Sequence, residues 1–173
     1  MKKILALLCA LLLLSVSAAS AEAGTVVNYN DRIKLNGLLP DGYRFSLQSQ
    51  TDLALEGRIL SDDPAVPVME VYIAFNESYA QVKDLSGLGD DVLNLVKQGF
   101  TNENDVTFST CQTASGDSLL VTRENAGQFL DFYTVFSGYE IELTLFPAEG
   151  QTLTEKQISS CMDFMSGLDV TAE

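Results

Sequence analysis

The strongest hydrophobic pattern of the chain lies between residues 129 and 146. The segment Phe129–Phe136 is almost entirely apolar or aromatic, Ser137-Gly138 interrupts it, and Tyr139–Phe146 then alternates apolar with polar residues. A run that is apolar on both faces is typical of a strand covered on both sides, whereas alternation is typical of a strand with one face in water. The pattern therefore predicts a β-hairpin whose first strand is central in a sheet.

Other segments with strand-like patterns precede this hairpin. Pro40-Asp41-Gly42 separates two of them, and proline followed by a glycine that accepts positive φ is typical of a turn. Residues 24–30 are expected to be a short lead into the fold. Further strands are predicted at Asp31–Leu39, Tyr43–Leu47, Leu53–Leu60, Val68–Phe75, Val106–Thr113 and Ser118–Arg123.

A first helix is predicted after the glycine-containing break at residues 86–89. Asp90 can cap it, and Gly99 is placed to end it. The residues of its predicted apolar face, which recur at helical spacing, are Val92, Leu93, Val96 and Phe100.

A second helix is predicted from about Thr154. Either Thr152 with Glu155 or Thr154 with Gln157 fits a capping box at its start. The apolar stripe expected on its inner face is Ile158, Cys161, Met162, Met165 and Leu168. The order of elements predicts an α+β fold, an antiparallel β-sheet of about six to seven strands with helices packed on it.

The first 23 residues have the pattern of a secretory signal peptide. Lys2 and Lys3 precede an apolar run, Ile4–Leu14, that is too short to span a bilayer, and small residues follow it. We therefore expect a signal peptide at residues 1–23, a single α+β domain at residues 24–173, and a secreted or extracytoplasmic protein without a membrane span after cleavage.

Charge and composition restrict the partners and the kinds of site that the protein can have. The chain has a net charge of −14 and contains no histidine. Such acidity disfavours nucleic acid as a partner, and the missing histidine removes the usual general base and the usual zinc ligand. We expect no cofactor.

Two cysteines, Cys111 on a predicted strand and Cys161 on the second predicted helix, remain after removal of the leader. An even number of cysteines in an exported chain favours a disulfide between them, and two separate buried thiols are the alternative.

Carboxylates supply the remaining candidate sites. Calcium requires several oxygen ligands, and the favoured loop contains Asn102, Asn104 and Asp105, although its spacing is not that of an EF-hand, so no metal site is expected. Glu140 and Glu142 are close enough for paired-carboxylate hydrolysis, but their strand face is expected to be exposed, with nothing to raise a pKa. Asn76-Glu77-Ser78 is a glycosylation sequon.

The hairpin also carries a set of aromatic residues that could line a ligand groove. Such a set is more often simply core, and we expect that here. Its members are Phe129, Phe132, Tyr133, Phe136 and Tyr139.

Three features together resemble the PsbP-like superfamily. They are Leu39-Pro40-Asp41-Gly42-Tyr43 before an alternating strand, the central aromatic hairpin, and a last helix that ends Met165-Ser166-Gly167-Leu168. That superfamily includes an extrinsic photosystem subunit and a Ran-binding nuclear import factor. The resemblance implies an α/β/α sandwich around an antiparallel sheet, and it implies no particular function because members bind very different partners.

These patterns favour an exported, non-catalytic, acidic domain that binds a protein or a cell-envelope component, as a monomer. The alternative is a module that binds a small ligand or calcium, and the third interpretation is a hydrolytic enzyme. The sequence contains no G-x-S-x-G, Walker-type or dinucleotide glycine pattern that would favour the third.

Overall fold

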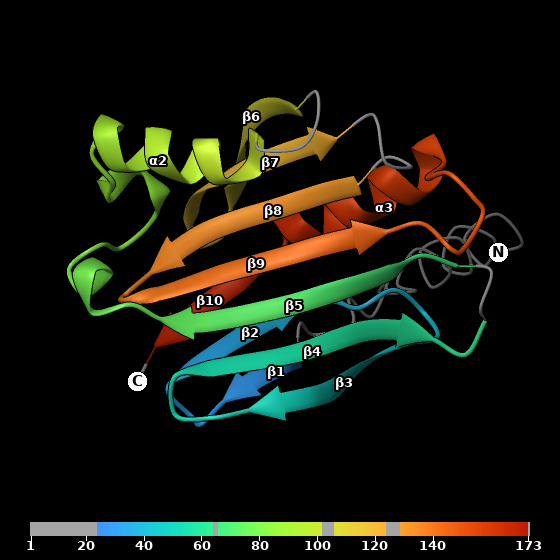
Figure 1. Cartoon of the computed structure of the whole chain (residues 1–173). Coiled ribbons are helices and arrows are strands. Elements are labelled where there is room, and N and C mark those ends of the chain that lie inside the picture. Colours follow the sequence, from blue (N-terminus) through green and yellow to red (C-terminus); the bar gives the residue numbers. More distant parts are fainter. Residues whose placement is uncertain (1–23, 64–65, 102–105, 124–128, 173) are drawn as a thin grey trace, which may run out of the picture.

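The computed structural model describes residues 24–63, 66–101, 106–123 and 129–172 (Figure 1). Its main element is a seven-stranded antiparallel sheet with the strand order β3-β4-β5-β9-β8-β7-β6. The strands are β3 (Tyr43–Gln50), β4 (Ala54–Ser61), β5 (Val68–Phe75), β6 (Val106–Thr113), β7 (Gly116–Arg123), β8 (Phe129–Phe136) and β9 (Tyr139–Phe146).

The predicted central hairpin is confirmed. β9 lies in the middle of the sheet and β8 beside it, with Phe136 opposite Tyr139. Ser137 and Gly138 both have positive φ, at 49° and 88°. Two such residues form the tight turn whose twist matches that of the flanking strands, which fixes the register of the hairpin.

A helix and a smaller sheet lie behind the large sheet in Figure 1. The helix is α3 (Glu155–Ser166), and the smaller antiparallel sheet has the order β1-β2-β10. Its strands are β1 (Gly24–Tyr29), β2 (Ile33–Gly37) and β10 (Asp169–Ala172).

The larger hydrophobic core lies between these layers. Ile141, Leu143 and Leu145 point into it from β9, and Met165 of α3 has no exposed surface. Ile158 and Met162 pack on the same core, as predicted for the inner stripe of the helix. Thr154 and Gln157 form the predicted capping box at its start.

The opposite face of the large sheet carries a second apolar cluster under α2 (Asp90–Thr101). Two short 3-10 helices, η1 (Glu77–Tyr79) and η2 (Leu85–Gly87), lead into this helix. Every residue of α2 keeps some exposed surface, and the cluster beneath it takes its sheet residues from β6, β7 and β8. Among the described residues, therefore, α2 covers one half of this face and leaves the half formed by β3, β4, β5 and β9 uncovered.

The structure confirms an α+β fold built on an antiparallel sheet with helices, and it corrects several details. The small sheet was not predicted: the expected lead at residues 24–30 forms β1, and β10 follows α3. Gly99 lies inside α2 instead of ending it. The predicted signal peptide, residues 1–23, lies outside the described residues, among which no helix is long and apolar enough to cross a membrane.

Candidate functional site

The uncovered half of the large sheet presents polar side chains in ordered rows. Strand register places Glu56 of β4 opposite Tyr72 of β5, Tyr72 opposite Glu142 of β9, and Glu142 opposite Tyr133 of β8. We call these four residues the Glu–Tyr row. Directly opposite residues have Cβ atoms about 5 Å apart, so the row is a continuous band across four strands.

A parallel row lies one step along the strands. Arg58 is opposite Glu70, Glu70 is opposite Thr144, and Thr144 is opposite Asp131. Arg58 Nη2 and Glu70 Oε1 are 2.7 Å apart, and both side chains are about half exposed. This ion pair compensates Glu70, whereas among the described residues neither Glu56 nor Glu142 of the Glu–Tyr row forms an ion pair.

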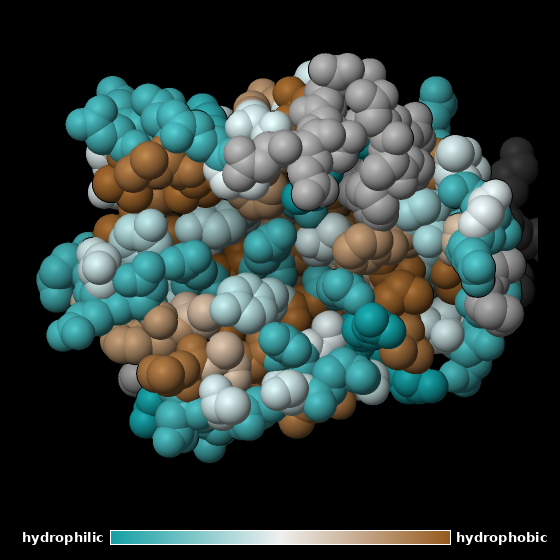
Figure 2. All heavy atoms as spheres, in the orientation of Figure 1, coloured by the Kyte–Doolittle hydropathy of each residue, from teal (hydrophilic) through white to brown (hydrophobic). Residues whose placement is uncertain are grey.

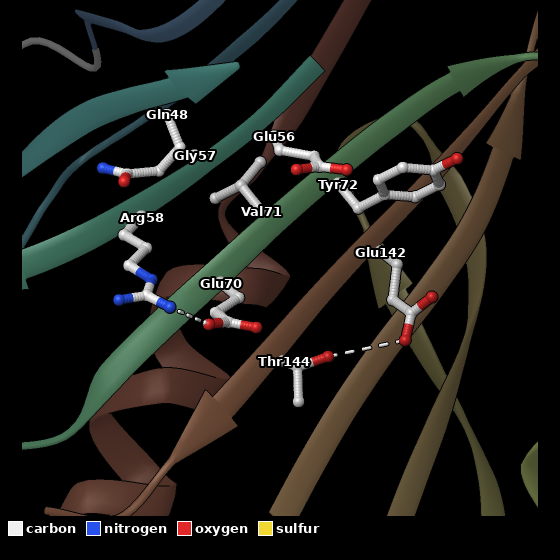
Figure 3. A pocket seen from close by; sticks show the side chains of 9 residues that line it. All are labelled: Gln48, Glu56, Gly57, Arg58, Glu70, Val71, Tyr72, Glu142 and Thr144. Carbon is white, nitrogen blue, oxygen red and sulfur yellow. Dashed lines mark hydrogen bonds and ion pairs between the residues drawn. The ribbon is translucent and has the colours of Figure 1, made fainter. Parts of the chain in front are cut away.

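The members of the two rows on β4, β5 and β9 line a shallow hollow of about 530 Å³ (Figure 3). Hydrophilic side chains lie across the middle of this face, next to the apolar band at the lower edge of α2 (Figure 2). Tyr72 is 40% exposed within the hollow. The surface is thus broad and open, and aromatic as well as acidic.

Asp131 of β8 is fully buried at the α2 side of this face. Its Oδ2 lies 2.9 Å from Nε of Arg123 on β7. Burial raises the pKa of Asp131, while Thr144 and the Arg123 guanidinium lower it. Sequence reasoning missed this residue, although its signal was present: Asp131 is the one charged residue of β8, whose other residues apart from Thr134 are apolar or aromatic.

Glu142 differs from what the sequence predicted. It is half-buried. Burial raises its pKa most, and the neighbouring Asp131 raises it further, whereas Arg123 and Thr144 lower it by smaller amounts. The expectation that nothing on this strand face would raise a pKa was therefore wrong. The reason is tertiary, because Asp131 and Arg123 come from strands that the pattern of β9 alone does not reveal.

A second cavity, of about 350 Å³, lies between α2 and the sheet. Glu142 lines both this cavity and the open hollow, so the two adjoin at that residue. The aromatic residues of its wall are Tyr79, Phe100 and Tyr133. The Arg123 guanidinium carbon lies 5.6 Å from the centre of the Phe100 ring, and Phe100 meets Tyr133 edge to face at 6.0 Å.

The aromatic set of the hairpin is mostly core, as predicted. Phe132 and Tyr139 are buried in the larger core, and Phe136 packs against it. Tyr133 is the exception, since it is buried under α2 and also lines the second cavity. The side chain of Phe129 lies outside the described part of the structure.

Glu140 forms the other acidic wall of this cavity, and its carboxylate accepts a hydrogen bond from Nδ2 of Asn76 at 2.7 Å. Asn76 Oδ1 in turn accepts from the backbone N–H of Ser78, capping η1. The amide of the predicted glycosylation sequon is therefore engaged in holding Glu140. A glycan on Asn76 would remove one donor from that contact.

The structure contains Cys111 and Cys161 as free buried thiols in place of the expected disulfide. Cys111 is on β6 at one edge of the large sheet, whereas Cys161 lies beside Ile59, Met69 and Leu145 of β4, β5 and β9. Both side chains belong to the larger core, in which α3 also contacts β6, but they are not bonded to each other. The number of cysteines in an exported chain could not show this.

The favoured calcium candidates, Asn102, Asn104 and Asp105, lie outside the described residues. Across the parts of the chain that the structure describes, no group of three or more histidine, cysteine, aspartate or glutamate side chains is arranged to hold a metal ion. Asp90 and Asp91 form the first turn of α2, where negative charge suits the helix dipole.

Comparison with known proteins gives no independent identification. No family model matches the chain, and a search of the curated proteins found no match.

Proposed function

We propose that this protein is a non-catalytic binding protein that uses the uncovered half of its large sheet to bind a positively charged segment of a partner protein. The observation that carries this proposal is the Glu–Tyr row, of which Glu56, Tyr72 and Glu142 line the open hollow while Tyr133 is buried under α2. These three residues span two strand spacings, about 10 Å at about 4.8 Å per strand, a length suited to about three residues of an extended peptide.

Charge supports a basic partner. The hollow contains Glu56, Glu70 and Glu142 against Arg58, and that arginine is already paired with Glu70. The net charge of −14 adds a long-range field that attracts cations and speeds their association. Tyrosine is enriched at protein interfaces because it combines a large apolar surface with a polar end, which fits Tyr72.

The other interpretations have less support. A small molecule binds best in a concave, mostly apolar pocket, whereas the hollow on the open face is shallow and polar. Hydrolysis needs two carboxyl groups that flank the scissile bond, whereas Glu140 and Glu142 lie two residues apart on one face of β9 and the nearby Asp131 has no exposed surface. Calcium binding rests on the loop of Asn102, Asn104 and Asp105 alone.

The wider setting belongs to the same proposal. A domain that is exported by a signal peptide at residues 1–23 would meet its basic partner outside the cytoplasm. An α/β/α sandwich of the PsbP-like kind would fit this function, because such a scaffold can carry a binding face that varies between members.

Binding of short peptides to the purified protein tests this function. Lysine-rich, glutamate-rich and uncharged peptides of equal length are labelled with a fluorophore and titrated by anisotropy. We expect the lysine-rich peptide to bind most tightly, and the variant E56Q/E142Q to weaken it by about tenfold, equivalent to about 1.4 kcal/mol.

The matched control is E155Q/D163N, which removes the same charge from exposed positions of α3 on the other side of the sheet. The control should bind the lysine-rich peptide within about twofold of the parent protein, since surface charges away from the site act only through the screened field. If both variants weakened binding equally, net charge alone would explain the binding, and the proposal would be overturned.

A further inference from the structure

The second cavity, at the edge of α2, is even more open than the hollow on the sheet and differs from it in its lining residues. The lining includes three aromatic residues and two carboxylates of β9, Glu140 and Glu142. We propose that this cavity receives one alkylammonium group, the side chain of a lysine in the segment bound on the open face. The proposal rests on the proposed function and names the residue type that the site selects.

The first argument is the aromatic wall. A cation gains electrostatic attraction over the face of an aromatic ring. The Arg123 guanidinium already occupies such a position on Phe100, at 5.6 Å. The cavity therefore has walls of the kind that bind cations, with Tyr79 and Tyr133 as its remaining rings.

The second argument is the charge that remains after the internal pairs are formed. Arg123 is neutralised by the buried Asp131 through the 2.9 Å contact. Lys97, the lysine of α2, is directed to the Phe108 ring on β6, at 5.8 Å. Glu140 thus has no ion-pair partner among the described residues, and Glu142 has only the electrostatic influence of Arg123, which is weaker than the effect of burial on its pKa.

The third argument is that the cavity's own groups favour an incoming cation. Burial, Asp131 and Glu140 all raise the pKa of Glu142, which means that its ionised form is disfavoured there. Burial and the nearby Glu140 raise the pKa of Tyr133, so its hydroxyl stays neutral. An ammonium group between these carboxylates would relieve the repulsion that the empty arrangement contains.

The fourth argument is continuity. Glu142 belongs to both the open hollow and the cavity, so a peptide lying along the Glu–Tyr row passes the cavity mouth. A lysine side chain has four methylene groups that can contact the aromatic wall while the ammonium reaches the carboxylates. The open face thus binds the segment, and the cavity recognises one of the segment's side chains.

The test uses variants that separate the cavity from the open face. Glu140→Gln changes the cavity alone, because Glu140 does not line the hollow, and it keeps an oxygen that can accept from Asn76. Glu56→Gln changes the open face alone. The probes are two peptides that differ at one central position, lysine or the uncharged norleucine, together with free 1,5-diaminopentane.

We expect the parent protein to bind the lysine peptide about tenfold more tightly than the norleucine peptide. Glu140→Gln should abolish this preference and leave the norleucine affinity unchanged, whereas Glu56→Gln should weaken both peptides and keep the preference. Phe100→Leu, checked for an unchanged unfolding midpoint, should also reduce the preference, because it removes the ring face without removing charge.

Three results overturn the inference. A lysine preference that survives Glu140→Gln excludes the cavity while the binding function on the open face stands. Binding of 1,5-diaminopentane without any lysine preference in the peptides makes the ligand a free amine instead of a side chain. If the parent protein binds none of the peptides, both this inference and the proposed function are overturned.

Discussion

Arg123 on β7 and Asp131 on β8 form an ion pair in which Nε and Oδ2 are 2.9 Å apart and the carboxylate has no contact with solvent. Strand register offsets them by one diagonal step, since Arg123 is opposite Phe129 and Asp131 is opposite Val121. The pair anchors one end of the row that continues through Thr144, beside the proposed binding face. A buried charge of this kind is tolerable only while its partner is present.

The first prediction concerns this pair. Arg123→Met keeps an apolar stem but leaves Asp131 without a counter-charge, so the free energy of unfolding in urea should fall by about 3 to 5 kcal/mol near neutral pH. Burial already raises the pKa of Asp131, so protonation should lessen the loss in mildly acidic buffer. The double variant Arg123→Met/Asp131→Leu should recover most of the stability, and a single-variant loss below about 0.5 kcal/mol would mean that the pair is not buried as described.

The second prediction concerns Glu142, whose pKa is raised in the folded protein by burial and by Asp131. The Glu142 carboxyl group therefore binds its proton more tightly in the folded state than in the unfolded chain. The contribution of Glu142 to stability is therefore complete below the ordinary glutamate range and is lost as the pH rises through the raised pKa. Glu142→Gln should raise the thermal midpoint near neutral pH, and the gain should vanish at about pH 4, where the native carboxyl is protonated.

The matched control for this effect is Glu56→Gln in the same row. Glu56 is exposed, so its replacement should change the midpoint little at either pH. If Glu142→Gln stabilises equally in acid and at neutral pH, the effect is due to packing and the electrostatic explanation fails.

The environment of Glu142 shows which structural features the local sequence pattern could not predict. The alternation of β9 correctly predicted that Ile141, Leu143 and Leu145 share the buried face. It could not show what lies opposite the polar face, because Asp131 and α2 reach that face through pairings made elsewhere in the chain. Local pattern determines the side on which a residue points, and tertiary contact determines its environment.

The small sheet was missed for a related reason. β10 has four residues, of which only Val170 is buried, so its local pattern is too short to predict a strand. Its pairing with β2 joins segments that are far apart in the chain, with Val170 opposite Leu35. The turn Asn30-Asp31, where both residues have positive φ, was the available signal for the hairpin of β1 and β2.

The third prediction tests the packing of α3. Met165 has no exposed surface in the larger core, so Met165→Ala should lower the free energy of unfolding by about 2 to 5 kcal/mol through lost burial and a residual cavity. Ser159→Ala, at an exposed position of the same helix, should change it by less than about 0.5 kcal/mol. Equal effects of the two variants in urea denaturation would contradict the placement of this helix face.

The last prediction concerns the two thiols. Burial raises the pKa of Cys161 to about 12 and also raises the pKa of Cys111, so neither forms much thiolate near neutral pH in the folded protein. Because the thiolate is the reactive form, iodoacetamide should modify both residues slowly in the native state and rapidly after unfolding in guanidinium without reductant. Mass spectrometry of the peptides that contain Cys111 and Cys161 measures this directly. Residues that stay unmodified after unfolding, and become reactive only when a reductant is added, would be disulfide-bonded, and the description of Cys111 and Cys161 as free thiols would then be wrong.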